Sequence, residues 1–459
     1  MAGHSDSYPT HIPLRMAANS AATLGGLVLA VLGALAAVFL SPSSQRTWNA
    51  FHFNWMFWSS VAIGMVMFAV ALHLTNARWA WSIKRFPLGG VAFLPFAFLL
   101  FIPLMLGGKD VFFHHWLPHE INGVMHNPIE GDAVLEAKAG WLNFTFLFVR
   151  SLAGMAVLFG LAMWFAYHQL RADVHGLDKA GRRSFAHGWL RGSGTANVRQ
   201  IAAESQHKAL KIGVFTAVAY AIVWGFVGMD VAMLTLPHFY STMFPVAFFI
   251  SAFHSGLAMT AIMVVLYRGS LRLQSFITER QFHDLGKLIF AFAVFWMYIN
   301  WSQYVVIWYG LLPHEQEYFI LKFLKFGPLV IAAVLLIFVL PFFGLLPRSV
   351  KKVPQILAGF CVLILAGHWL ERFLLATPNF WLAEWGTVGI GLPEIAMALA
   401  FLGLFVASYT WYMATFPILP SPVTLAAMPT GLVEVEVPNG HVGGVHGGPH
   451  GAGPHIAGA

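Results

Sequence analysis

The chain has 459 residues, of which 58% are hydrophobic and 10% are charged, and its mean hydropathy is +0.70. A soluble chain carries about 25% charged residues, so this composition excludes an ordinary soluble protein. The net charge of +7 does not indicate nucleic-acid binding, because no folded basic domain is present. The one cysteine, Cys361, excludes a disulfide framework, a cysteine-ligated iron–sulfur cluster and a cysteine-rich zinc site within this chain.

Ten long apolar runs follow one another along the chain. A helix of about 20 apolar residues crosses the bilayer hydrocarbon, so each run can form one transmembrane helix. The runs lie near 16–40, 54–77, 88–106, 139–169, 209–229, 241–267, 288–312, 326–346, 353–370 and 388–416. The first run is long for a signal-peptide core, which favours an uncleaved first helix. The sequence therefore predicts an all-α polytopic membrane protein with about ten transmembrane helices.

Positive charge is sorted between the connections that join these runs. With a cytoplasmic N-terminus, the cytoplasmic connections hold 19 of the 26 Lys and Arg residues, and the outer connections hold seven. Cytoplasmic loops of membrane proteins are enriched in Lys and Arg, so this orientation is expected. We expect a polar arm at 1–15, a transmembrane domain at 16–416 and a Gly/His/Pro-rich tail at 417–459. The histidines of the tail suit either metal capture or contact with a partner.

His254 is the deepest titratable residue that the sequence predicts. No Asp, Glu, Lys or Arg occurs between Asp230 and Arg268, so the helix near 241–267 places His254 at its middle. An imidazole at that depth suits a proton relay. A neutral histidine hydrogen-bonded across a helix interface fits the same pattern. No helix carries two deep histidines a few turns apart, so the pattern does not predict a b-type haem.

Other ionisable residues lie nearer the predicted ends of the helices. As members of a proton path, His73 and Asp284 would lie toward the cytoplasm, and Asp230 with Arg150 toward the outside. Glu394 is a further candidate at the start of the last helix. Each of these residues could instead anchor its helix at the membrane interface.

Two further polar groups follow helical spacing. Asn300, Gln303 and Tyr304 form one stripe, which could line a water wire, contact a quinone head group or hold two helices together. His368, Glu371 and Arg372 share a face near the outer end of the ninth helix, where a local Glu–Arg pair is the simplest interpretation.

Three long blocks of this chain resemble a known family of membrane subunits. They lie at 57–86, 209–253 and 282–319, and they contain HLTNARWAWSIKRF, WGFVGMD and NWSQYVVIWYG. The blocks resemble the NrfD/polysulfide-reductase membrane-anchor family, and within it the F subunits of bacterial alternative complex III. The resemblance covers most of 50–345 and leaves the His-rich tail outside.

The resemblance implies a multi-pass subunit of the bacterial inner (cytoplasmic) membrane, built on two four-helix bundles with flanking helices. It implies a complex that oxidises menaquinol or another quinol and passes electrons to a cytochrome c-type acceptor. Haem c and iron–sulfur clusters would reside on partner subunits, beside a second NrfD-like subunit, and this chain would bind no redox cofactor or metal. Its expected role is scaffolding, with proton translocation as an open question. A quinone-binding subunit in its own right and an independent secondary transporter are the alternatives.

Overall fold

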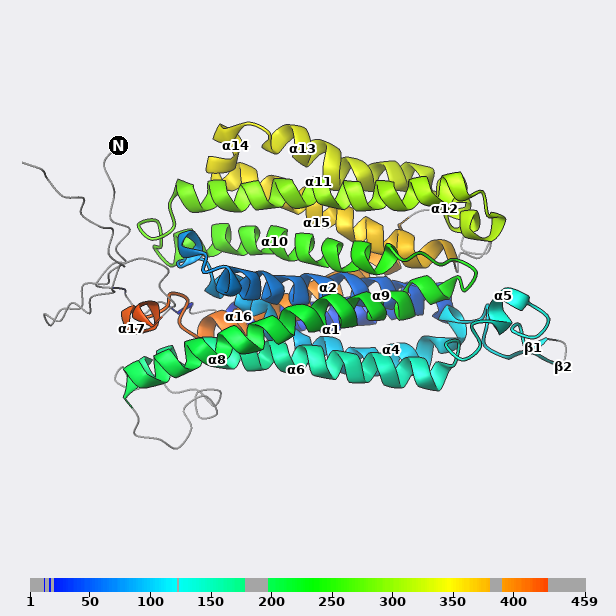
Figure 1. Ribbon diagram of the computed structural model, residues 1–459, viewed down its shortest axis with the longest axis horizontal. Coiled ribbons are helices and arrows are strands. Elements are labelled where there is room, and N and C mark those ends of the chain that lie inside the picture. Colours follow the sequence, from blue (N-terminus) through cyan, green and yellow to red (C-terminus); the bar gives the residue numbers. More distant parts are fainter. Residues whose placement is uncertain are drawn as a thin grey trace, which may run out of the picture.

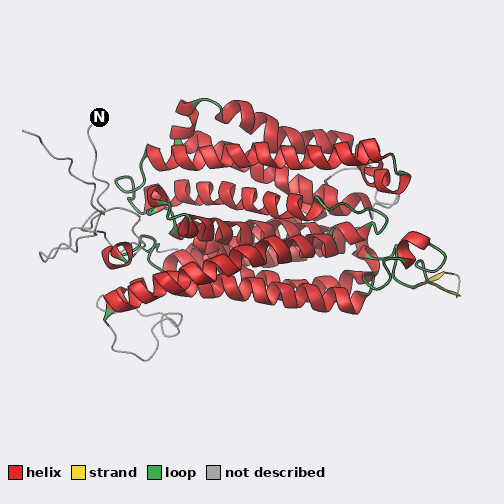
Figure 2. Cartoon of the chain, in the orientation of Figure 1, coloured by secondary structure: helices red, strands yellow, loops and turns green. Residues whose placement is uncertain are grey.

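The computed structural model describes residues 12, 16–17, 20–121, 124–177, 197–379 and 390–427. Within these ranges, ten helices are long and apolar enough to cross a membrane. They lie side by side along the long axis of the molecule (Figure 1). The prediction of an all-α, multi-pass membrane protein is thereby confirmed, and in the described ranges Figure 2 draws strands only at the hairpin β1–β2.

The first half of the chain forms five of these spans. They are α1 (Ser20–Phe39), α2 (Ser44–Leu74), α4 (Leu94–Phe112), α6 (Phe144–Leu177) and α8 (Val198–Ala219), the last continued by η4 (Tyr220–Trp224) and α9 (Gly225–Val231). Three short elements connect α2 to α4, namely η1 (Arg78–Ala80), α3 (Arg85–Leu88) and η2 (Gly89–Ala92). The short η5 (Met233–Thr235) follows α9. Between α4 and α6 lie the strands β1 (His119–Ile121) and β2 (Val124–His126) and the short helix α5 (Ala133–Glu136).

The second half forms the other five. They are α10 (Phe244–Ser270), α11 (Glu279–Gly310), α12 (Pro313–Val334) continued by η6 (Leu335–Val339) and α13 (Leu340–Leu345), α15 (Pro354–Ala376), and α16 (Leu392–Thr415). The short helices α14 (Arg348–Lys352), η7 (Thr377–Asn379) and α17 (Pro422–Ala426) follow α13, α15 and α16. Several of the long helices begin with proline in their first turn, where its missing N–H costs no hydrogen bond.

The helices form two groups of four that meet along α2 and α10. The first group contains α2, α4, α6 and α8–α9, the second contains α10, α11, α12–α13 and α15, and α1 and α16 pair beside α2. Two glycines set the closeness of the central contact. A Cβ on Gly256 of α10 would lie 2.2 Å from the backbone carbon of Gly64 in α2, so only glycine allows the two backbones to touch.

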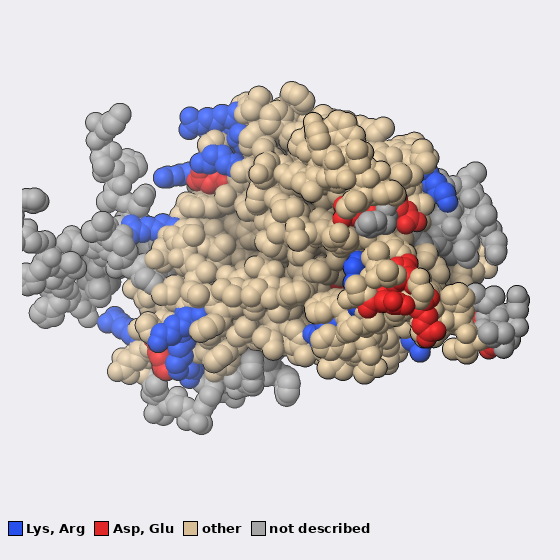
Figure 3. Space-filling view, turned by 45° about the vertical axis from the view of Figure 1, so that its right-hand side comes forward, with Lys and Arg blue, Asp and Glu red and all other residues tan. Residues whose placement is uncertain are grey.

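The two ends of the bundle differ in charge. Figure 3 shows Lys and Arg gathered at the end where α8 and α11 begin, and Asp and Glu gathered at the end that carries β1 and β2. We call these the basic end and the acidic end. Residues 421–427 pack against the basic end through α17, which contacts α6 and α8. Most of the predicted polar arm and the His-rich part of the predicted tail lie outside the described residues.

Candidate functional site

A chain of two buried histidines and one partly buried glutamate connects the middle of α10 to α15. The Nδ1 atom of His254 lies 3.0 Å from Nε2 of His368, and Nδ1 of His368 lies 2.8 Å from a carboxylate oxygen of Glu371. The two histidine residues are 0% and 1% exposed. We call His254, His368 and Glu371 the relay. Since an imidazole can donate from one ring nitrogen while accepting at the other, the relay is a continuous hydrogen-bonded path.

Three helices hold the relay in place. His368 and Glu371 are three residues apart on α15 and therefore lie on one face of that helix. The second carboxylate oxygen of Glu371 accepts a hydrogen bond of 2.8 Å from the indole nitrogen of Trp296 on α11. The close contact of α10 with α2 fixes the helix that carries His254. The other ring nitrogen of His254 is buried and faces the backbone of Ile289 without a well-formed hydrogen bond.

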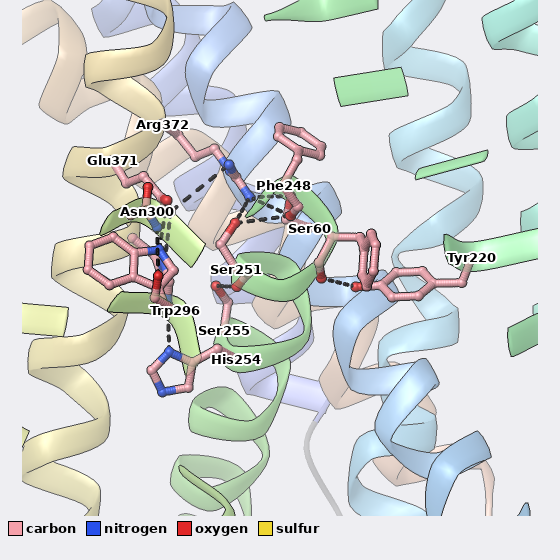
Figure 4. Close-up of polar contacts among 12 residues, drawn as sticks. Ser60, Tyr220, Phe248, Ser251, His254, Ser255, Trp296, Asn300, Glu371 and Arg372 are labelled. Carbon is pink, nitrogen blue, oxygen red and sulfur yellow. Dashed lines mark hydrogen bonds and ion pairs between the residues drawn. The ribbon is translucent and has the colours of Figure 1, made fainter. Parts of the chain in front are cut away.

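Arg372 turns away from the carboxylate beside it in the chain. Its guanidinium donates to the hydroxyl of Ser251 at 2.6 Å and to the carbonyl of Phe248 at 3.3 Å, both on α10, as Figure 4 shows. It also lies 4.1 Å from the centre of the Phe248 ring. Its nearest approach to Glu371 is 4.0 Å. The simple local Glu–Arg pair expected from the sequence is thus the weaker contact, and Arg372 mainly ties α15 to α10.

A cavity of about 490 Å³ opens beside the relay. Its walls come from α11, α12, η6 and α15, and they include Trp296, Asn300, Gln303, Tyr304, Tyr318, Lys322 and Glu371. The predicted polar stripe on α11 therefore lines one wall. The Nε2 atom of Gln303 is buried and has no hydrogen-bond partner among the described residues, whereas Asn300 donates to the carbonyl of Trp296 at 2.9 Å. Lys322 lies 3.5 Å from the centre of the Tyr318 ring.

Arg150 and Asp230 form an ion pair between α6 and α9. One guanidinium nitrogen lies 2.5 Å from a carboxylate oxygen, and Nε lies 3.0 Å from the other. Ser151 donates to the same carboxylate at 2.6 Å. The Asp230 side chain is 1% exposed, and the Arg150 guanidinium stacks on Trp141. The structure brings these two sequence candidates together, and their contacts hold α6 against α9.

His73 belongs to a separate buried polar cluster at the basic end. Its Nδ1 atom lies 2.7 Å from the ammonium of Lys84 and 3.2 Å from the side-chain nitrogen of Gln169. The neighbouring Arg85 pairs with Asp173, which also accepts a hydrogen bond of 2.5 Å from Thr424 of α17. Burial, together with the charge of Arg85, lowers the pKa of Lys84 to about 7.

The last two sequence candidates lie in local pairs at opposite ends of the bundle. Glu394 accepts two hydrogen bonds from Arg46, at 2.7 and 2.9 Å, and caps the backbone N–H of Gly391 at the start of α16. Asp284 lies 2.7 Å from the ammonium of Lys287, one turn away on α11. Neither residue touches the relay.

Sequence reasoning found His254 and missed its partner. The sequence predicts His368 near the outer end of its helix, and spacing within one helix does not show which neighbouring helix a side chain faces. The three-residue spacing of His368 and Glu371 was the only available signal, since a histidine fixed by a carboxylate is a common arrangement in proton transfer. Lys84, Gln169 and Lys322 were also missed, because each lies near the end of an apolar run and looks like an interface anchor.

A comparison with protein-family models found no match, and a comparison with curated proteins found none either. Within the described ranges, no group of three or more His, Cys, Asp or Glu side chains is placed to hold a metal ion.

Proposed function

We propose that this chain is a membrane subunit of a respiratory quinol-oxidising complex in the bacterial cytoplasmic membrane, and that it carries protons through the relay. The observation that supports the proton role is the unbroken path His254–His368–Glu371 in a protein of ten apolar helices. The resemblance of three sequence blocks to the F subunits of alternative complex III supports membership of the complex. Electrons would travel through haem c and iron–sulfur clusters on partner subunits.

The relay can transfer one proton while the side chains keep their hydrogen-bond distances. With Glu371 ionised, His368 donates through Nδ1 and accepts at Nε2, and His254 donates through Nδ1. A proton that arrives at Nε2 of His254 releases the Nδ1 proton to His368. His368 in turn releases its own Nδ1 proton to Glu371, and rotation or reprotonation of the rings restores the starting arrangement. Glu371 lines the cavity and its side chain is 14% exposed, so it can pass its proton into the cavity.

Co-purification tests the assignment to a complex. The chain is isolated from native membranes through an affinity tag in a mild detergent, and its companions are identified by mass spectrometry. We expect a second polytopic subunit of similar size, an iron–sulfur subunit and a multihaem cytochrome c. A chain that purifies alone and stays folded contradicts the proposal.

Proton release per quinol oxidised tests the relay in that complex. His254→Leu removes both ring nitrogens at the deepest point, and we expect a lower ratio in an assembled complex. His207→Leu is the matched control, because His207 is exposed on α8. An unchanged ratio in His254→Leu contradicts a relay role.

Quinone binding by this chain itself is a second candidate function, and the cavity favours it. Gln303 offers a buried, unpartnered donor, Tyr304 and Trp296 offer aromatic faces, and Glu371 offers a proton acceptor. A photoreactive quinone should then label residues of α11 or α12, and excess quinol should suppress the labelling. Gln303→Leu should reduce the labelling, while Asn300→Leu should change it less. Labelling confined to partner subunits contradicts this candidate.

A further inference from the structure

The basic end carries a hollow of about 390 Å³ between the start of α11 and the short helix α14. It is lined by Thr278, Glu279, Arg280, His283, Arg348 and Lys352. None of these residues takes part in the relay or its cavity. The hollow thus has a different chemical character from the cavity beside Glu371, because four of its six lining residues are basic.

Local contacts fix the two elements that form the hollow, α11 and α14. Thr278 caps the start of α11 with a capping box, in which the backbone N–H of Thr278 donates to the Gln281 side chain at 2.9 Å. On the other side, Lys351 points inward and donates to the carbonyl of Leu345 at 2.7 Å. Its aliphatic stem lies against Gly286, where a Cβ would come within 2.9 Å of Lys351 Cγ. This packing fixes α14 against α11.

The cations in the hollow are poorly neutralised by the protein. Lys352 lies 3.8 Å from Glu279, but both side chains are largely exposed, so this pair is weak. Arg280 and Arg348 have no ion-pair partner among the described residues. Asp284 is close by on α11, where its carboxylate lies 2.7 Å from the ammonium of Lys287 and 3.7 Å from Nδ1 of His283. Two guanidinium groups therefore remain available to an outside anion.

Apolar side chains lie beside the hollow along the helices that lead to it. Leu346 and Val353 flank α14 in the chain and are 58% and 40% exposed, and Phe343 of α13 is 68% exposed. A ligand that places an anion in the hollow could therefore lay hydrocarbon against α13 and α15. Phosphate suits guanidinium groups, because two oxygens of the tetrahedral phosphate can accept paired hydrogen bonds from the planar guanidinium fork.

We propose that this hollow binds the phosphodiester headgroup of an anionic phospholipid, with the acyl chains lying along α13. Basic pockets between transmembrane helices bind such headgroups in other membrane proteins. A general attraction between basic loops and anionic lipid would act equally at every basic segment. The proposal instead assigns the binding to Arg280 and Arg348, which line the hollow from two separate elements, α11 and α14.

Lipid retention by the purified protein tests this assignment. The complete chain, with any subunits that accompany it, is delipidated in detergent, titrated with phosphatidylglycerol and examined by native mass spectrometry. The variant Arg280→Gln/Arg348→Gln is compared with Lys208→Gln/Lys211→Gln, which removes two exposed charges from α8 at the same end. Each lost charge-assisted contact should weaken binding by about tenfold, so the first variant should lose the lipid and the control should keep it.

Three outcomes would overturn the proposal. Equal loss in both double variants would mean general charge attraction. Displacement of phosphatidylglycerol by equimolar inorganic phosphate would mean a free-anion site. Loss of a protein subunit from the first variant with the lipid retained would mean a protein-binding surface. The unfolding temperature of each variant in phosphatidylcholine alone, which should match that of the parent protein, checks that folding is intact.

Discussion

His254 of α10 and His368 of α15 lie 3.0 Å apart, nitrogen to nitrogen, although 114 residues separate them in the chain. Both side chains are buried, and the rings meet at a steep interplanar angle of 86°. This arrangement points a nitrogen of one ring at a nitrogen of the other. The contact converts two isolated membrane histidines into one path that ends at a carboxylate.

The close contact of α2 and α10 is predicted to be indispensable for this path. In Gly256→Leu the new Cβ atom would lie 2.2 Å from the backbone carbon of Gly64, so α2 and α10 must separate to admit the side chain. We expect the variant to unfold at a much lower temperature or to fail to accumulate in membranes. Gly160→Leu on α6, where no atom lies within 4 Å of the Cβ position, is the matched control and should resemble the parent chain.

The Arg150–Asp230 pair is predicted to stabilise the fold. Removing one member of a buried ion pair leaves the other charge uncompensated and costs about 3–5 kcal/mol. Arg150→Met and Asp230→Asn should each lower the free energy of unfolding, measured by titration of detergent micelles with a denaturing surfactant. The double variant should lose less than the sum of the two, because neither charge is then left alone. Strictly additive losses would show that the two side chains do not interact.

Lys84 is predicted to make stability depend on pH. Its pKa is lowered to about 7 in the folded chain by burial and by Arg85, against about 10.4 in an unfolded chain. Between these values the folded chain binds fewer protons, so this residue makes stability rise with pH across that window and has no such effect below about pH 7. His73 and Arg85 are the charged or titratable groups nearest to it.

The variant Lys84→Met tests that dependence. The free energy of unfolding of this variant should exceed that of the parent chain most at pH 6, and the difference should be smaller by about 3 kcal/mol at pH 9. Lys208→Met, at an exposed position on α8, should show no such trend. A difference between Lys84→Met and the parent that stays constant with pH would mean that Lys84 keeps its usual pKa.

The sequence predicted the architecture well because the membrane imposes a simple pattern on it. Apolar runs of the required length gave all ten spans, and the charge-free segment around His254 gave its central position. The pairing of helix faces was not predictable in the same way. His254 meets His368 where α15 packs against α10, and Gly64 and Gly256 bring α10 close to α2. Such contacts depend on packing between distant segments, which periodicity along one segment does not reveal.

The candidate site was predicted in part for the same reason. Asn300, Gln303 and Tyr304 were expected to share a face, since their spacing alone determines this. The cavity that they line also needs α12 and the end of α15, and no local pattern linked Lys322 or Glu371 to that stripe. Arg150 and Asp230 were both predicted as members of a proton path or as interface anchors. Their pairing could not be predicted, because it depends on the contact between α6 and α9.

Proton release per quinol in a relay double variant tests the central claim most directly. The intact complex is compared with His254→Leu, Glu371→Gln and the combination of the two, with electron transfer measured in parallel. Because both residues belong to one path, each single variant should lower the ratio by the same amount, and the double variant should lower it no further. Additive losses, or a ratio equal to that of the unmodified complex in either single variant, would contradict a single relay through His254, His368 and Glu371.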